Sequence, residues 1–103
     1  MSEETTKLTV QVESELEELI PGFIRNRFND VAKIEEHLQE DDFESIKQIG
    51  HTMKGNGAGY GFEEISEIGK QIESAAGEQK SEEVRDLISR LSSYLNQVSI
   101  EYI

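Results

Sequence analysis

The sequence predicts an all-α fold, an antiparallel four-helix bundle with a short extra N-terminal helix. Apolar residues recur at spacings of three and four in four long segments, which is the period of an amphipathic helix. Short polar turns join these segments, and helices joined by short loops pack as antiparallel neighbours. The chain has one proline and no cysteine, so few residues interrupt a helix and no disulfide is possible.

The length of the chain indicates a single domain. A chain of 103 residues has room for one modest apolar core. We expect residues 1–13 to form an N-terminal arm and residues 14–103 to form the bundle. Within the arm, the alternating pattern over residues 8–12 fits either a short strand or a frayed end, and the sequence leaves both open.

The segment after the arm predicts a short helix, a break and then a long helix. Ser14 with Glu17 forms a capping box, which would start a helix that ends at Ile20. The Pro-Gly pair at 21–22 would then break or kink the chain, because proline lacks a backbone donor. The first long helix is expected over residues 23–38.

Capping residues and apolar stripes predict the other three helices. Asp41 with Glu44 forms a second capping box, and the helix that it starts should weaken after Lys54, where glycines follow. A third helix is expected over residues 62–77, and Ser81 should cap the fourth. The residues expected on the buried faces are Phe23, Ile24, Phe28, Val31, Ile34, Leu38, Phe43, Ile46, Ile49 or Gly50, Met53, Phe62, Ile65, Ile68, Ile72, Ala76, Val84, Leu87, Ile88, Leu91, Tyr94, Leu95 and Val98.

Charge and composition disfavour several classes of function. The chain has 10 Lys and Arg against 22 Asp and Glu, a net charge of −12, and lacks the basic cluster that a nucleic-acid-binding protein needs. The same charge disfavours an anionic membrane surface, and no apolar run approaches the roughly 20 residues of a membrane helix. The acidic N-terminus does not resemble a signal peptide. We therefore expect a cytoplasmic protein whose partners are proteins.

Residues 49–62, which read IGHTMKGNGAGYGF, are the stretch in which we expect the chemistry. They contain His51, one of two histidines, and Lys54 one helical turn later on the same flank. Lys47 stands one turn earlier, so this row of the helix should border solvent. An exposed imidazole is largely neutral at pH 7 and can act as a nucleophile, while lysine ammonium groups can neutralise phosphoryl oxygens. The pattern predicts a phosphoryl acceptor.

Five of the eight glycines lie in the same stretch and allow two interpretations. Gly55, Gly57 and Gly59 could form a row without side chains, which would let the backbone of a partner approach the histidine. Alternatively, residues 57–61 form the turn between two helices, which would leave Gly55 unexplained. No lysine follows the glycines as in a P-loop, and the dinucleotide-binding pattern does not fit this register, so nucleotide binding is not expected.

The pattern His-x-x-Lys-Gly-x5-Gly, which runs from His51 to Gly61, resembles the signature of histidine-containing phosphotransfer (HPt) domains. The helical frame over about residues 14–100 also resembles that family. The resemblance implies that His51 accepts a phosphoryl group from the aspartate of a receiver domain and passes it on. It further implies that Lys54 is the charge partner, that Gly55 gives access to the histidine and that Gly61 forms the turn into the next helix.

The resemblance also has implications for supporting residues, cofactors and partners. Glu73 stands where the family often has Gln or Glu near the histidine, and Lys47 could add to the positive field. Receiver domains, a histidine kinase or both would be the partners of a monomeric carrier. No cofactor is expected on this chain, because any Mg²⁺ would belong to the receiver. No ATP site fits in 103 residues, so we expect a phosphocarrier that is not an enzyme.

Two other functions stay open at this point. The chain could be a helical adaptor or scaffold that is never phosphorylated. It could also be the direct substrate of a separate histidine kinase and ATP, since residues 55–62 resemble the phosphoacceptor domain of the chemotaxis kinase. A metal site is not expected, because neither His51 nor His37 has the Glu three residues earlier that helical di-metal sites use. His37 is interpreted as a solvated residue in an acidic run.

Overall fold

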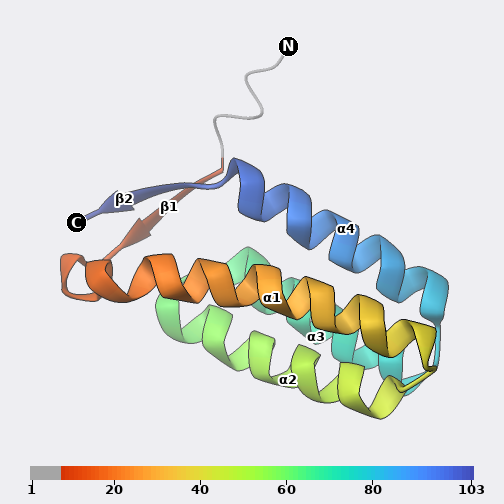
Figure 1. Ribbon diagram of the computed structural model, residues 1–103. Helices are drawn as coiled ribbons and strands as arrows, with labels where there is room; N and C mark the ends of the chain where they lie inside the picture. Colours follow the sequence, from red (N-terminus) through yellow and green to blue (C-terminus); the bar gives the residue numbers. More distant parts are fainter. Residues whose placement is uncertain (1–7) are drawn as a thin grey trace.

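The computed structural model describes residues 8–103, which form four α-helices, one 3₁₀-helix and two short strands (Figure 1). The elements in chain order are β1 (Thr9–Val12), the 3₁₀-helix η2 (Ser14–Leu19), α1 (Ile20–Gln39), α2 (Phe43–Tyr60), α3 (Glu63–Gly77), α4 (Ser81–Gln97) and β2 (Ser99–Tyr102). The predicted four-helix fold is confirmed, and the short extra N-terminal helix is η2. Within the described residues, no helix is long and apolar enough to cross a membrane.

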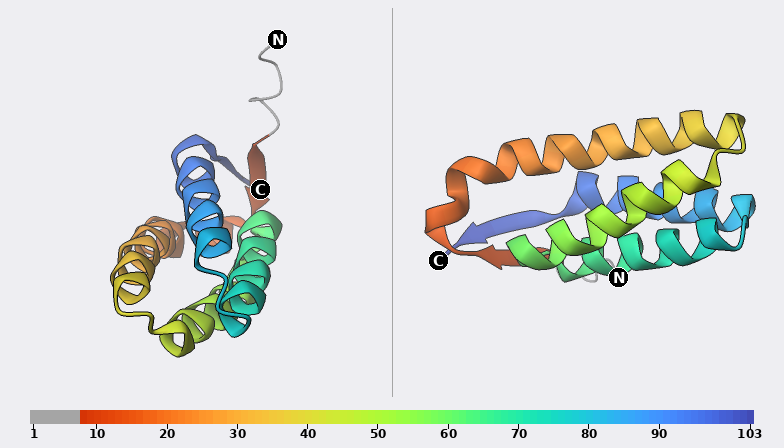
Figure 2. Two further views of the ribbon diagram at one scale, coloured as in Figure 1. Left: turned by 90° about the vertical axis from the view of Figure 1, so that its right-hand side faces the viewer. Right: turned by 90° about the horizontal axis from the view of Figure 1, so that it is seen from below.

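The four helices surround one apolar core. Seen along the bundle, each helix lies beside the next one in the chain, and α4 closes the ring against α1 (Figure 2). The side chains that are almost fully buried are Phe62, Ile20, Ile34, Ile46, Met53, Ile65, Ile68, Ile72, Leu91, Val12 and Val84. Most of these positions belong to the stripes that the sequence predicts, because burial of an apolar face is what stabilises each helix.

The face that α1 turns to the core differs from the predicted one. Phe28, expected in the core, is 37% exposed, whereas Arg27 is only 6% exposed. Successive helical residues point in directions about 100° apart, so when Arg27 faces the core, Phe28 faces toward solvent. The guanidinium of Arg27 is accommodated by Asp30, with Nε 2.9 Å from Oδ2, and by the ring of Phe23, whose centroid lies 4.8 Å away.

Of the break or kink predicted at residues 21–22, the break does not form; η2 gives way to α1 at Ile20. η2 continues directly into α1, and Pro21 lies in the first turn of α1. A missing N–H costs nothing there, because the first N–H groups of a helix have no intrahelical partner. The Ser14 capping box is also wrong: the Ser14 hydroxyl donates to the carbonyl oxygen of Ile103 at 2.8 Å, and Glu13 precedes η2 without a side-chain cap.

The two ends of the described chain meet in a small parallel sheet (Figure 1). β1 pairs with β2 in a register that joins Thr9 to Ser99 and Val12 to Tyr102. Val12 is 2% exposed and packs against the core of the bundle. Of the two interpretations of the alternating segment, the strand is therefore the one that forms, because the C-terminus supplies its partner.

Two further predicted caps are displaced by one residue. Asp42 caps α2, and its carboxylate accepts hydrogen bonds from the Ser45 amide at 3.2 Å and from the Ser45 hydroxyl at 2.7 Å. Asp41, the predicted cap, instead takes a left-handed φ of 56° in the turn before it. α4 begins at Ser81 itself, so the cap position belongs to Lys80, which makes no side-chain capping bond.

α2 extends further than the sequence predicts. Its glycines do not end it after Lys54; the helix continues to Tyr60 and is terminated by Gly61, whose φ of 88° lies in the left-handed region that favours glycine. The reversal at Gly61 places Phe62 in the core at 0% exposure, where its ring stacks on Phe23 with centroids 5.2 Å apart.

Close backbone packing against α3 explains why α2 tolerates its glycines. A Cβ added at Gly57 would lie 2.6 Å from the amide nitrogen of Ser66, which no side chain could accept without movement. Gly57 is buried, whereas at Gly59 a Cβ would meet nothing within 4 Å. The predicted open row of three glycines is thus wrong at Gly57, which packs against a helix of its own protein.

This packing predicts opposite effects of alanine at the two positions. Gly57→Ala should destabilise the protein by about 1–3 kcal/mol through overpacking. Gly59→Ala should be neutral or stabilising by up to about 1 kcal/mol, because alanine is the better helix former. Urea unfolding followed by circular dichroism measures both free energies. Equal stability of the two variants would contradict the inferred contact.

Candidate functional site

His51, Lys54 and Glu73 lie together on the surface formed by α2 and α3. The side chain of His51 is 63% exposed, and its Nδ1 lies 3.1 Å from Oε2 of Glu73. The ammonium of Lys54 lies 3.5 Å from the other carboxylate oxygen, Oε1. Two residues one turn apart on α2 are therefore joined by one carboxylate from α3, and each of its oxygens faces a different partner.

The hydrogen bond to Glu73 determines which ring nitrogen of His51 is available. An ionised carboxylate can only accept, so the neutral imidazole must carry its proton on Nδ1 and donate it to Oε2. Nε2 then retains its lone pair. The arrangement holds the ring in one tautomer and in one orientation, with Nε2 as the nucleophilic atom.

The electrostatic surroundings keep Glu73 in its accepting form. Partial burial raises the pKa of the Glu73 carboxyl, but the hydrogen bond from His51 and the charge of Lys54 together lower it by more than burial raises it. The resulting pKa lies below the ordinary value of 4.5. The pairing of a carboxyl whose pKa is lowered on folding stabilises the protein fully at a pH above the pKa of the unfolded chain. This stabilisation is lost as the pH falls through the pKa of the folded protein. The pairing is therefore complete at neutral pH and is lost only in acid.

The other predicted residues of the site have different positions. Gly55 is exposed directly after Lys54, and a Cβ there would meet nothing within 4 Å. Gly61 terminates α2. Lys47 is exposed one helical turn before His51 and, among the described residues, makes no ion pair or hydrogen bond with the cluster; it lines a hollow together with Glu44 and other residues of the helix ends. The structure thus brings together three of the predicted residues, places Gly55 beside them and leaves Lys47 outside.

A shallow hollow lies between α1 and α2, and no pattern in the sequence predicts it. It is lined by Leu19, Gly22, Phe23, Asn26, Arg27, Asn56 and Tyr60. Leu19, which is 52% exposed, contributes apolar surface to this hollow. The hollow needs the α1–α2 contact, so no local pattern could predict it.

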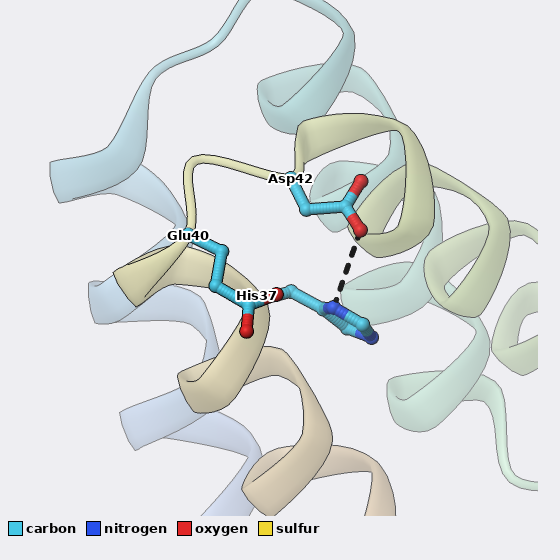
Figure 3. Close-up of side chains that lie close together, drawn as sticks. All are labelled: His37, Glu40 and Asp42. Atoms are coloured by element: carbon cyan, nitrogen blue, oxygen red, sulfur yellow. Dashed lines mark ion pairs between the residues drawn. The ribbon is translucent and has the colours of Figure 1, made fainter.

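The second histidine lies at the turn between α1 and α2 (Figure 3). Ligand atoms of His37, Glu40 and Asp42 lie within 4.8 Å of one another, and the His37 Nδ1 is 3.5 Å from Oδ2 of Asp42. The interpretation of His37 as a solvated residue holds only in part, because its side chain is 28% exposed. Both oxygens of Asp42 already accept hydrogen bonds from Ser45, and these lower the pKa of the Asp42 carboxyl. Capping of α2 therefore accounts for the position of Asp42.

The role of Glu73 can be tested through the tautomer of His51. In the wild type, ¹⁵N NMR at a pH where the ring is neutral should show the Nδ1–H form as the main species. In Glu73→Gln the amide can either accept from or donate to Nδ1, so the preference should shrink to a mixture of both forms. A wild-type tautomer ratio in Glu73→Gln would contradict this role.

Comparison with known proteins agrees with the resemblance seen in the sequence. Residues 18–100 match the family model of the Hpt domain. The search of curated proteins and the search of solved structures each gave no match. The matched segment contains all four helices and His51. Because it covers far more than half of the 103 residues, the chain belongs to the Hpt domain family.

Proposed function

We propose that this chain is a phosphocarrier of a two-component phosphorelay. His51 accepts a phosphoryl group from the aspartyl phosphate of a receiver domain and passes it to the aspartate of another receiver. Membership of the Hpt family supports histidine phosphotransfer in general. The observation that supports His51 as the acceptor is its exposed ring, held at Nδ1 by Glu73.

The geometry suggests how the transfer proceeds. The Nε2 lone pair attacks phosphorus, and the bond between phosphorus and the aspartate oxygen breaks as the new N–P bond forms. The receiver keeps its carboxylate as the leaving group. The imidazole ring gains positive charge in this step, and the Glu73 carboxylate at 3.1 Å from Nδ1 stabilises that charge. Transfer to the next receiver is the same step in reverse.

Lys54 is positioned to act on the phosphoryl oxygens. Its side chain is 42% exposed, and its 3.5 Å contact with Glu73 is a surface ion pair of the kind that contributes little to stability. The flexible ammonium can therefore exchange Glu73 for a phosphoryl oxygen as charge accumulates there. Lys54 would neutralise part of the phosphoryl charge on the side of the carrier.

The surface around His51 is suited to the approach of another protein. Gly55 and Gly59 present bare helix backbone with nothing within 4 Å of an added Cβ. Such a surface lets the backbone of a receiver come close to the histidine. The receiver would bring the Mg²⁺ and most of the catalytic apparatus, so the carrier needs no cofactor, and a monomer is sufficient.

The acceptor is tested by transfer from a panel of phosphorylated receiver domains to wild type and to His51→Gln. We expect acid-labile, base-stable label on the wild type only, since a phosphoramidate has this stability. Label on His51→Gln would assign the acceptor elsewhere. Without label from any receiver, addition of a histidine kinase and ATP would distinguish a direct kinase substrate from a scaffold that is not phosphorylated.

The contribution of Lys54 is tested against a second exposed lysine of the same helix. Lys54→Ala should slow transfer by between about tenfold and 100-fold, because a positive group near the developing charge is lost. Lys47→Ala removes the same charge one helical turn before His51 but breaks no contact with Glu73, so it should slow transfer clearly less than Lys54→Ala. Rapid-quench measurements with one receiver give both rates. Equal rates for the two variants would refute the role of Lys54.

A further inference from the structure

Two buried glycines lie in the contact between α2 and α3, directly beside the site. Gly50 precedes His51 on α2, and a Cβ added there would lie 2.7 Å from the amide nitrogen of Glu73. Gly69 lies on α3, and a Cβ added there would lie 2.6 Å from the amide nitrogen of Lys54. Each glycine therefore contacts the backbone of one of the residues that surround the histidine.

The two glycines also face each other. A Cβ on either one would lie 2.8 Å from the carbonyl oxygen of the other. The helix backbones are thus in direct contact at this level, with no side chain between them. His51 follows Gly50 on α2, and Glu73 lies on α3 with Gly69. The contact between the two glycines therefore determines the distance from His51 to Glu73.

We propose that Gly50 and Gly69 are positioning residues for His51. They set the separation of α2 and α3 at which one carboxylate, that of Glu73, reaches both the Nδ1 of His51 and the ammonium of Lys54. The inference rests on the proposed function of His51 as the phosphoryl acceptor. It adds that the contact between the two glycines keeps the imidazole in the orientation needed for reaction.

The distances indicate how sensitive the site is to this separation. An alanine Cβ at residue 50 would lie 2.7 Å from the amide nitrogen of Glu73, whereas ordinary van der Waals contact begins at 3.4 Å. To relieve this overlap, the two helices would have to separate by about 0.7 Å. A similar increase in helix separation would take the 3.1 Å contact between Nδ1 and Oε2 beyond hydrogen-bonding distance. A movement of Glu73 toward His51 alone would lengthen the 3.5 Å contact between its other oxygen and the ammonium of Lys54.

Gly57 provides a matched control in the same interface. It is buried like Gly50, and its added Cβ would make an equally close contact, 2.6 Å from the amide nitrogen of Ser66. Residue 57 lies six positions after His51, which corresponds to about 9 Å along the helix axis. Alanine at this position should disturb the packing to a similar extent without separating His51 from Glu73.

The test compares Gly50→Ala, Gly69→Ala and Gly57→Ala with the wild type. We expect ¹⁵N NMR to show a shift toward the Nε2–H tautomer of His51 in the first two variants and the wild-type ratio in Gly57→Ala. Phosphoryl transfer should slow by up to about 100-fold in the first two, the loss that a misplacement of about 1 Å can cause. Folded Gly50→Ala and Gly69→Ala with wild-type tautomer ratios would overturn the proposal.

A second variant tests the same separation with the glycines intact. Glu73→Asp shortens the carboxylate arm by one methylene and leaves the helix contact unchanged, so it should weaken the tautomer preference even if the alanine variants do not fold. A wild-type tautomer ratio in Glu73→Asp would also overturn the proposal. The NMR measurement needs no phosphoryl donor. An intact tautomer preference in a wild type that accepts no phosphoryl group would refute only the proposed function.

Discussion

The direct backbone contact between α2 and α3 is the constraint on which the rest of the site depends. Gly50, Gly57 and Gly69 leave no room for a side chain between the two helices, and a Cβ at any of them would lie within 2.8 Å of backbone atoms of the facing helix. Glycine inside a helix costs about 1 kcal/mol relative to alanine. The close packing offsets this cost, which is why α2 remains helical through its glycine-rich end.

The site is a local electrostatic arrangement within a strongly acidic protein. The chain carries a net charge of −12, yet the surface around His51 contains a lysine whose ammonium shares one carboxylate with the histidine. That carboxylate comes from α3; partial burial raises its pKa, but its two partners lower the pKa by more, so it stays below the ordinary value. The histidine, the lysine and the glutamate thus come from two helices, and their contacts depend on the separation of these helices, whereas the overall charge affects mainly solubility and encounter with partners.

Patterns with the period of one element were sufficient to predict the fold. The apolar stripes gave the four helices and most of the core, because their period of three to four residues directly reflects helix geometry. The errors lie where a contact from elsewhere overrides a local preference. Ser14 bonds to Ile103, which lies 89 residues away, instead of capping a helix. Pro21 is a local exception, because it lies in the first turn of α1, where no N–H is needed. Phe28 is exposed because Arg27 takes the buried position.

The sequence by itself determined the four helices and the placement of His51 and Lys54 on one flank of α2, because residues three apart on a helix are neighbours in any fold. The resemblance to the HPt family singled out Glu73, but the tertiary structure decided its contact with His51, across 22 residues of sequence. Tertiary structure also decided that Gly57 is buried while Gly55 and Gly59 are open, and that β1 pairs with β2. These features depend on which helix faces which, and no local pattern of residues contains that information.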